Sequence, residues 1–173
     1  MIQSVQSIAL LGMKSDAAVA LGSNLGDRSR ELIDACSFLG SIAELRACSS
    51  VYENRAEGFL SDQLFLNAVV HIRYDGTPVE LMRQLLDHEQ SRGRKRTLDY
   101  SDRPIDLDLI AFGQVEMQTA ELTLPHPRWK ERSFVIQPLA DLKAWRIWPF
   151  MKEHLKEQLD PTGELIKKEL KLC

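Results

Sequence analysis

The sequence has no apolar run that approaches the roughly 18 residues of a membrane-spanning helix. It has only three cysteines, Cys36, Cys48 and Cys173, and no two of them form a C-x-x-C pair. Their odd number and spacing argue against zinc ligands and against a disulfide framework, so we expect reduced, mostly structural thiols in a cytoplasmic protein. Neither sign of charge dominates, since the net charge is −3 and the pI is about 5.8. That balance does not favour a nucleic-acid-binding protein.

Internal repeats and low-complexity segments are absent as well. We therefore expect one domain over residues 1–173, and a hydrophobic content of 44% is enough for a packed core. Residues 1–15 carry little pattern and lack the features of a signal peptide, so we expect a ragged extension there. Residues 160–173 are charged and are expected to form a surface tail.

The apolar periodicity predicts an alternation of strands and helices. A capping box marks the second helix, with Thr77 as the cap, Pro78 at the first helical position and Glu80 facing back to the cap. The order matches the β-α-β-β-α-β core of ferredoxin-like α+β folds, followed by C-terminal additions. The expected elements are a strand over 17–21, a helix to about residue 40, one strand over 42–52, a strand over 65–72, a helix from 78 towards 93, a strand over 103–110, a short strand near 122–124 and an amphipathic helix over 149–159.

The turn between the first strand and the first helix contains Gly22 and Gly26. Two glycines at such a place suggest a phosphate-binding loop, but the spacing fits neither G-x-x-x-x-G-K-[ST] nor G-x-G-x-x-G. We therefore interpret the glycines as turn residues and expect Asn24 or Asp27 to cap the helix.

The strand over 103–110 carries two aspartates, Asp106 and Asp108, between apolar residues. Side chains alternate along a strand, so both carboxylates lie on the same face with their Cα atoms about 7 Å apart. Such a pair either forms a solvated face or binds a hard cation such as Mg²⁺. The basic residues nearby favour the cation, because a metal site flanked by arginines suits polyphosphate chemistry. These basic residues are Arg94, Lys95, Arg96, Arg103, Arg128 and Arg132.

Several short motifs in a fixed order resemble the 6-hydroxymethyl-7,8-dihydropterin pyrophosphokinase family, over residues 18–142. The motifs are Ala20-Leu21-Gly22-Ser23-Asn24-Leu25-Gly26-Asp27-Arg28, Ser50-Val51-Tyr52-Glu53, Phe65-Leu66-Asn67-Ala68-Val69, Glu89, Gly93-Arg94, Arg103-Pro104-Ile105-Asp106-Leu107-Asp108-Leu109, Pro125-His126-Pro127-Arg128 and Glu131-Arg132-Ser133-Phe134-Val135.

The resemblance implies an enzyme of folate biosynthesis with a ferredoxin-like fold. It would transfer the terminal pyrophosphoryl unit of ATP to the hydroxymethyl group of a reduced pterin and release AMP. Two Mg²⁺ ions, held by Asp106 and Asp108, would act with ATP. The partners would be these substrates, with no nucleic acid and no membrane, and the protein would be a monomer.

The resemblance also assigns residues to the two substrates. The catalytic residues would be Arg94, Arg96, Arg103, Asp106 and Asp108. ATP would be bound by Glu89, Arg94, Arg103, His126 and Arg132. The pterin would be bound by Asn54, Ala56, Glu57, Phe65, Asn67 and Phe134, with the two phenylalanines either lining the pterin pocket or belonging to the core.

Three positions depart from the family pattern. The segment over 54–58 replaces a Thr-x-Pro-x-Gly motif, Tyr100 stands where tryptophan is common, and Pro104 replaces a common threonine.

Two alternative functions stay open. One is a weakened homologue that binds nucleotide or pterin without catalysis. The other is an RNA-recognition module, which shares the β-α-β-β-α-β order, although no RNP1-like string is present.

Overall fold

A computed structural model describes residues 14–94, 101–157 and 165–173. Its strands are β1 (Ser15–Ser23), β2 (Glu44–Cys48), β3 (Val51–Asn54), β4 (Phe65–Tyr74), β5 (Asp106–Phe112), β6 (Met117–Gln118), β7 (Thr123–Leu124) and β8 (Ile166–Lys168). Six of them form one antiparallel sheet in the order β5-β1-β4-β3-β8, with β2 also paired to β4. Strands β6 and β7 form a separate pair.

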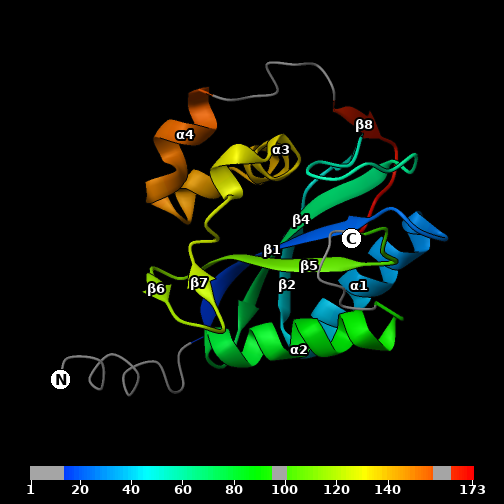
Figure 1. Cartoon of the computed structure of the whole chain (residues 1–173). Coiled ribbons are helices and arrows are strands. Elements are labelled where there is room, and N and C mark those ends of the chain that lie inside the picture. Colours follow the sequence, from blue (N-terminus) through cyan, green and yellow to red (C-terminus); the bar gives the residue numbers. More distant parts are fainter. Residues whose placement is uncertain (1–13, 95–100, 158–164) are drawn as a thin grey trace.

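Helices cover both faces of the main sheet (Figure 1). Helices α1 (Arg28–Ile42) and α2 (Pro78–Ser91) lie on one side, and α3 (Ser133–Asp141) and α4 (Lys152–Glu157) lie on the other. A short 3-10 turn over Trp129–Glu131 precedes α3, and two more, over Ala144–Arg146 and Pro149–Met151, lie between α3 and α4. No helix among the described residues is long and apolar enough to cross a membrane.

Successive side chains of β1 point to opposite faces of the sheet, so this strand contributes to two hydrophobic cores. Ala17, Val19 and Leu21 belong to the core beneath α1 and α2, whereas Ala18 belongs to the core beneath α3. The central strand β4 is buried along nearly its whole length because both of its faces are covered. The molecule is therefore a mixed α/β protein with a helix-covered antiparallel sheet.

Both predicted helix starts have side-chain caps. Thr77 Oγ1 accepts from the backbone N–H of Glu80, and the Glu80 carboxylate accepts from the backbone N–H of Thr77, which confirms the capping box. At α1 the cap is Asp27, whose carboxylate accepts from the backbone N–H of Arg30 at 3.0 Å. Asn24, the other candidate, has a different role that is described below.

The single strand expected over 42–52 is wrong. Helix α1 continues to Ile42, and two strands follow it, separated at Ser49 and Ser50. Both backbone groups of Val69, opposite the break, are satisfied, because its carbonyl accepts from the Ser49 N–H and its N–H donates to Ser49 Oγ, each at 2.9 Å. A serine hydroxyl thus replaces one ladder hydrogen bond and lets the chain change direction.

The C-terminal region was predicted only in part. A helix forms over Lys152–Glu157, after a 3-10 turn, and its expected end at 159 lies outside the described residues. Residues 165–173 of the tail are exposed or half-buried, and Ile166–Lys168 also form β8, which pairs with β3. At the other end, Ser15 already belongs to β1, and residues 1–13 of the expected extension lie outside the described part.

The expectation of three reduced cysteines is also wrong. Cys48 and Cys173 form a disulfide across 125 positions of sequence. Cys36 keeps a free, buried thiol, and burial raises its pKa. No local spacing signals this disulfide, because the return of the tail alongside β3 brings its two residues together.

Candidate active site

One pocket collects most of the predicted site residues at the ends of β1, β3, β4 and β5. Its lining includes Gly22, Asn54, Glu57, Phe65, Asn67, Arg103, Asp106, Asp108, Arg132 and Phe134. Glu89 and Arg94 are not part of the lining, but they lie directly behind it. The chain positions that meet here come from all parts of the sequence between β1 and α3.

The two aspartates of β5 lie opposite small residues of β1. Asp106 is the register partner of Gly22, and Asp108 is the partner of Ala20, so the neighbouring strand β1 places only small residues beside the two aspartates. β5 starts at Asp106, three residues later than predicted. The preceding Arg103 is instead held by its backbone: its N–H donates to Asn24 Oδ1 at 2.8 Å, and its carbonyl accepts from the Asn24 backbone N–H at 3.2 Å.

Each of these carboxylates is paired with arginine. Asp106 forms ion pairs with Arg94 and, at 2.9 Å, with Arg103. Asp108 is 3.1 Å from a guanidinium nitrogen of Arg132. Even so, the pKa of Asp108 is raised, first by desolvation and then by the negative charge of Asp106. The site therefore holds two mutually repelling carboxylates in a ring of cations.

Glu89 is a third acidic group behind this pair, at the end of α2. Its side chain is almost fully buried, and Oε1 accepts from the backbone N–H of Leu107 at 2.6 Å and from Arg94. Oε2 has no hydrogen-bond partner among the described residues. Desolvation raises the pKa of Glu89 to about 7, and the charges of Asp106 and Asp108 act in the same direction. Glu89 thus couples α2, β5 and Arg94.

Arg103 links the charged part of the pocket to its aromatic part. Its guanidinium carbon lies 5.3 Å from the ring centroid of Phe65 and 5.9 Å from that of Phe59. These distances suit cation–π contacts. The backbone bonds to Asn24 fix the start of this side chain, and Asn24 Nδ2 also donates to Asp102 at 2.6 Å.

The opposite part of the pocket carries two buried amides. Asn67 Nδ2 donates to Asn54 Oδ1 at 2.6 Å, and Asn54 Nδ2 donates to the Arg55 carbonyl. Gly22 makes room for this pair, because a Cβ atom there would lie 3.0 Å from Asn67 Oδ1. Phe134 stands nearby at the start of α3, with the Arg132 guanidinium carbon 5.7 Å from its ring centroid.

The remaining predicted residues are less closely tied to the pocket. The backbone N–H of His126 donates to the Ile110 carbonyl at 2.9 Å, which places His126 beside β5. Burial lowers the pKa of this histidine, whereas the charge of Asp108 raises it. Ala56 shares the segment over 54–58 but is not a lining residue. Lys95, Arg96 and Tyr100 lie outside the described residues.

Sequence reasoning missed the roles of two residues near the end of the first strand. Gly22 was interpreted as a turn residue, but it lies within β1 and accommodates Asn67. Asn24 was considered as a helix cap, but it anchors Arg103. The only available signal was their position at the end of a buried strand. Their partners are more than 40 residues away along the chain, so spacing alone could not identify them.

Comparisons with known proteins place the chain among pyrophosphokinases. Residues 18–144 match the model of a family described as 7,8-dihydro-6-hydroxymethylpterin-pyrophosphokinase. A 2-amino-4-hydroxy-6-hydroxymethyldihydropteridine pyrophosphokinase of Bacillus subtilis is 37% identical over 75% of this chain and 79% of its own length. Proteins of the same name from Aquifex aeolicus and Synechocystis are 33% and 39% identical, over 80% and 85% of this chain and 87% and 77% of their own lengths.

Solved structures support the fold. A crystal structure of HPPK-DHPS in complex with substrates has a TM-score of 0.58 at 10% identity, over 90% of this chain and 46% of that one. Wild-type Plasmodium falciparum HPPK-DHPS with STZ-DHP gives the same TM-score and identity over 95% and 49%. The present chain thus spans about half the length of these solved chains, and at this identity the likeness concerns the fold alone.

Proposed function

Since the chain belongs to the 7,8-dihydro-6-hydroxymethylpterin-pyrophosphokinase family, we propose that it transfers pyrophosphate from ATP to the hydroxymethyl group of 6-hydroxymethyl-7,8-dihydropterin. AMP is the second product, and the reaction is a step of folate biosynthesis. The observation that carries the proposal is one pocket with paired aspartates and arginines at one end and buried amides with aromatic rings at the other. This is what a polyphosphate and a flat heterocycle need side by side.

At the charged end, Arg94, Arg103 and Arg132 bind the triphosphate of ATP. Their present partners are carboxylates, and phosphate oxygens offer arginine the same bidentate geometry. His126, beside β5, adds to this phosphate site. Glu89, which lies behind the lining, acts on the nucleotide through Arg94, because its Oε1 accepts from the Arg94 guanidinium and so orients that cation.

The donor set of Asp106 and Asp108 fits Mg²⁺, because it consists of carboxylate oxygens on one strand face. The raised pKa of Asp108 supports the fit, since a cation there stabilises the charged form that burial and Asp106 disfavour. Asp106 and Asp108 would hold two Mg²⁺ ions together with ATP, and these ions would supply positive charge for the triphosphate. The arginines orient the γ- and β-phosphoryl groups towards the pterin end and keep water from the reacting phosphorus.

At the other end, Asn67 and Asn54 bind the edge of the pterin. An amide donates and accepts at once, which matches the adjacent donor and acceptor atoms of the pterin ring. Phe134 and Phe65 pack against the two ring faces. Glu57 and the backbone of Ala56 complete the site from the segment over 54–58. In this position the hydroxymethyl oxygen faces the β-phosphorus of ATP.

The rest of the molecule suits this proposal. We infer a ferredoxin-like core, supported by the strand order β5-β1-β4-β3 and by the two helices α1 and α2 on one face. We also infer one domain, a monomer and a cytoplasmic location. An RNA-recognition module needs an open sheet face, and here α3 covers the face opposite α1 and α2 (Figure 1).

The proposal is tested by mixing the protein with ATP, Mg²⁺ and the reduced pterin and separating the nucleotides by chromatography. AMP should appear only when the pterin is present. Asp108→Asn should abolish most of it, and Asp87→Asn, an exposed carboxylate of α2, is the matched control and should not. Stoichiometric ADP, or no pterin-dependent turnover, would contradict the proposal.

A further inference from the structure

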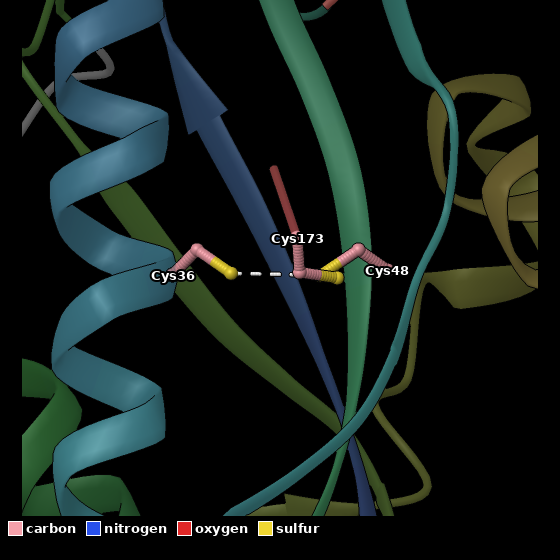
Figure 2. A group of neighbouring side chains, drawn as sticks. All are labelled: Cys36, Cys48 and Cys173. Carbon is pink, nitrogen blue, oxygen red and sulfur yellow. Dashed lines mark hydrogen bonds between the residues drawn. A yellow bond between two sulfur atoms is a disulfide. The ribbon is translucent and has the colours of Figure 1, made fainter. Parts of the chain in front are cut away.

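Three elements far apart in sequence bring the three cysteines of the chain together. Cys36 comes from α1, Cys48 from the end of β2, and Cys173 from the segment after β8 (Figure 2). All three sulfur atoms lie within 4.8 Å of one another, and the Cys36 and Cys48 sulfurs are 3.5 Å apart. We propose that, once the disulfide is reduced, these three thiolates bind one Zn²⁺ ion.

The distances suit a zinc site. Thiolates bind Zn²⁺ at about 2.3 Å, which places neighbouring sulfurs of a tetrahedral site roughly 3.8 Å apart. The Cys36 and Cys48 sulfurs are already near that separation. Only Cys173 has to move away from Cys48 after reduction, and it is exposed at the surface whereas Cys36 is buried. Water from the exposed side completes a four-coordinate shell.

The same geometry argues against the other chemistry that three clustered cysteines suggest, which is direct thiol–disulfide exchange. A thiolate attacks a disulfide in line with the S–S bond. With 3.5 Å between the Cys36 and Cys48 sulfurs and an S–S bond of about 2.05 Å, an in-line attack would put the Cys36 and Cys173 sulfurs roughly 5.5 Å apart. The observed limit is 4.8 Å, so the sulfurs form a bent group that is closer to a triangle than to a line.

Formation of the site requires reduction by a dithiol. The dithiol is oxidised to its own disulfide while Cys48 and Cys173 each become a thiol, a transfer of two electrons and two protons. Zn²⁺ then displaces the three thiol protons to solvent. Thiolate sulfur selects a soft or borderline ion, so this site differs in kind from the all-oxygen pair of Asp106 and Asp108.

The ion would preserve a connection that reduction breaks. Cys173 follows β8, which pairs with β3, and Lys168 forms a 2.8 Å ion pair with the buried Glu53. Leu170 and Leu172 of the same segment pack on the main core. In the oxidised chain a disulfide holds this segment to the sheet, and in the reduced chain zinc would do so.

The test titrates Zn²⁺ into the reduced, reductant-free chain in competition with a chromophoric chelator. The expected result is one ion per chain, with binding lost when the disulfide is re-formed. Cys36→Ser, Cys48→Ser and Cys173→Ser should each weaken binding by at least about 10- to 100-fold, because even an outer-shell partner of a metal is worth that much. Asp108→Asn should bind zinc as the unmodified chain does.

A melting experiment gives a second result that does not depend on activity. Zn²⁺ should raise the melting temperature of the reduced chain and leave that of reduced Cys173→Ser unchanged, since Cys173 lies near the end of the tail and its loss need not unfold the protein. Substoichiometric binding, equal binding by the oxidised chain, or retention of tight binding by the Cys→Ser variants would overturn the proposal. Loss of binding in Asp108→Asn would assign the ion to the carboxylates and would also overturn it.

Discussion

Single residues give the two ends of the pocket their different chemistry, and Asn67 shows this for the amide end. It is a buried amide near the start of β4, between the apolar residues Leu66 and Ala68, and its side chain donates to another amide, that of Asn54. Nothing in sheet formation requires that pair. The proposed pterin edge explains it, because it gives both amides donors and acceptors to match.

Asn67→Ala should therefore weaken pterin binding and leave ATP binding nearly unchanged. Removing one partner of a buried hydrogen-bonded set costs about 1–3 kcal/mol, which corresponds to roughly 5- to 150-fold in affinity. Calorimetry with each ligand separately measures both effects, and Gln118→Ala removes an exposed amide as the control. Equal losses for the two ligands would refute the assignment of Asn67.

At Asp108 we expect a substitution to reduce activity without reducing stability. Burial and the charge of Asp106 both disfavour its ionised form, so Asp108→Asn should leave the stability of the free protein level or slightly higher. Activity should fall about 100-fold or more, because the metal it would hold is worth several kcal/mol in the transition state. Thermal melts and initial rates measure the two effects. Early melting with near-normal turnover would mean that the pair is structural.

At this scale the sequence identified most of the charged and aromatic residues of the pocket, because motif order and residue chemistry are local properties. It did not identify Asn24 as the anchor of Arg103 or Gly22 as the space for Asn67. Those roles depend on partners that are distant in sequence. The sequence likewise did not predict which arginine contacts which aspartate. Residue types determine the charges, but the fold determines which charged side chains meet.

Strands and helices position these residues, and the pairing of β1 with β4 on one side and β5 on the other brings the two ends of the pocket together. Gly22 is the register partner of both Asn67 and Asp106, so it touches both ends of the pocket. Its lack of a side chain is required there by space. A glycine at an exposed helical position, such as Gly40 in α1, has no such role, because nothing lies within 4 Å of a Cβ added there.

Alanine at the two glycines should thus have opposite effects. Gly22→Ala should destabilise the protein by about 1–3 kcal/mol through overpacking and raise the KM for the pterin, because the buried Asn67 must move. Gly40→Ala should stabilise α1 by about 0.5–1 kcal/mol and leave the kinetics unchanged. Urea unfolding and pterin-dependent rates test both. A neutral Gly22→Ala would show that the pocket tolerates a methyl group at this position.

Elements with strong local signals were predicted well, and those without them were not. The capping box located the start of α2 because its hydrogen bonds join residues three apart. The break at Ser49 escaped notice because it depends on the hydroxyl bonding to Val69 across the sheet. β8 escaped notice for a similar reason, since a short charged segment becomes a strand only by pairing with β3.

At the level of the whole molecule, the disulfide between Cys48 and Cys173 cross-links residues 125 positions apart in the sequence. Its reduction without metal should lower the free energy of unfolding by about 2–4 kcal/mol, because the unfolded chain gains the freedom that the cross-link removed. Urea unfolding with and without a dithiol measures the difference. Cys36→Ser should retain the difference and Cys173→Ser should abolish it. An equal difference in Cys173→Ser would assign the effect of the reductant to another cause.

The proposed reaction transfers two phosphoryl groups of ATP as one unit. ATP labelled with radioactive phosphorus at the β-position, and separately at the γ-position, distinguishes it from the transfer of one group. Attack on the β-phosphorus carries both labels to the pterin in equal amounts and leaves AMP without either. If only the γ-label reaches the pterin while the β-label stays with the nucleotide as ADP, the protein is a simple kinase and pyrophosphoryl transfer by this pocket is refuted.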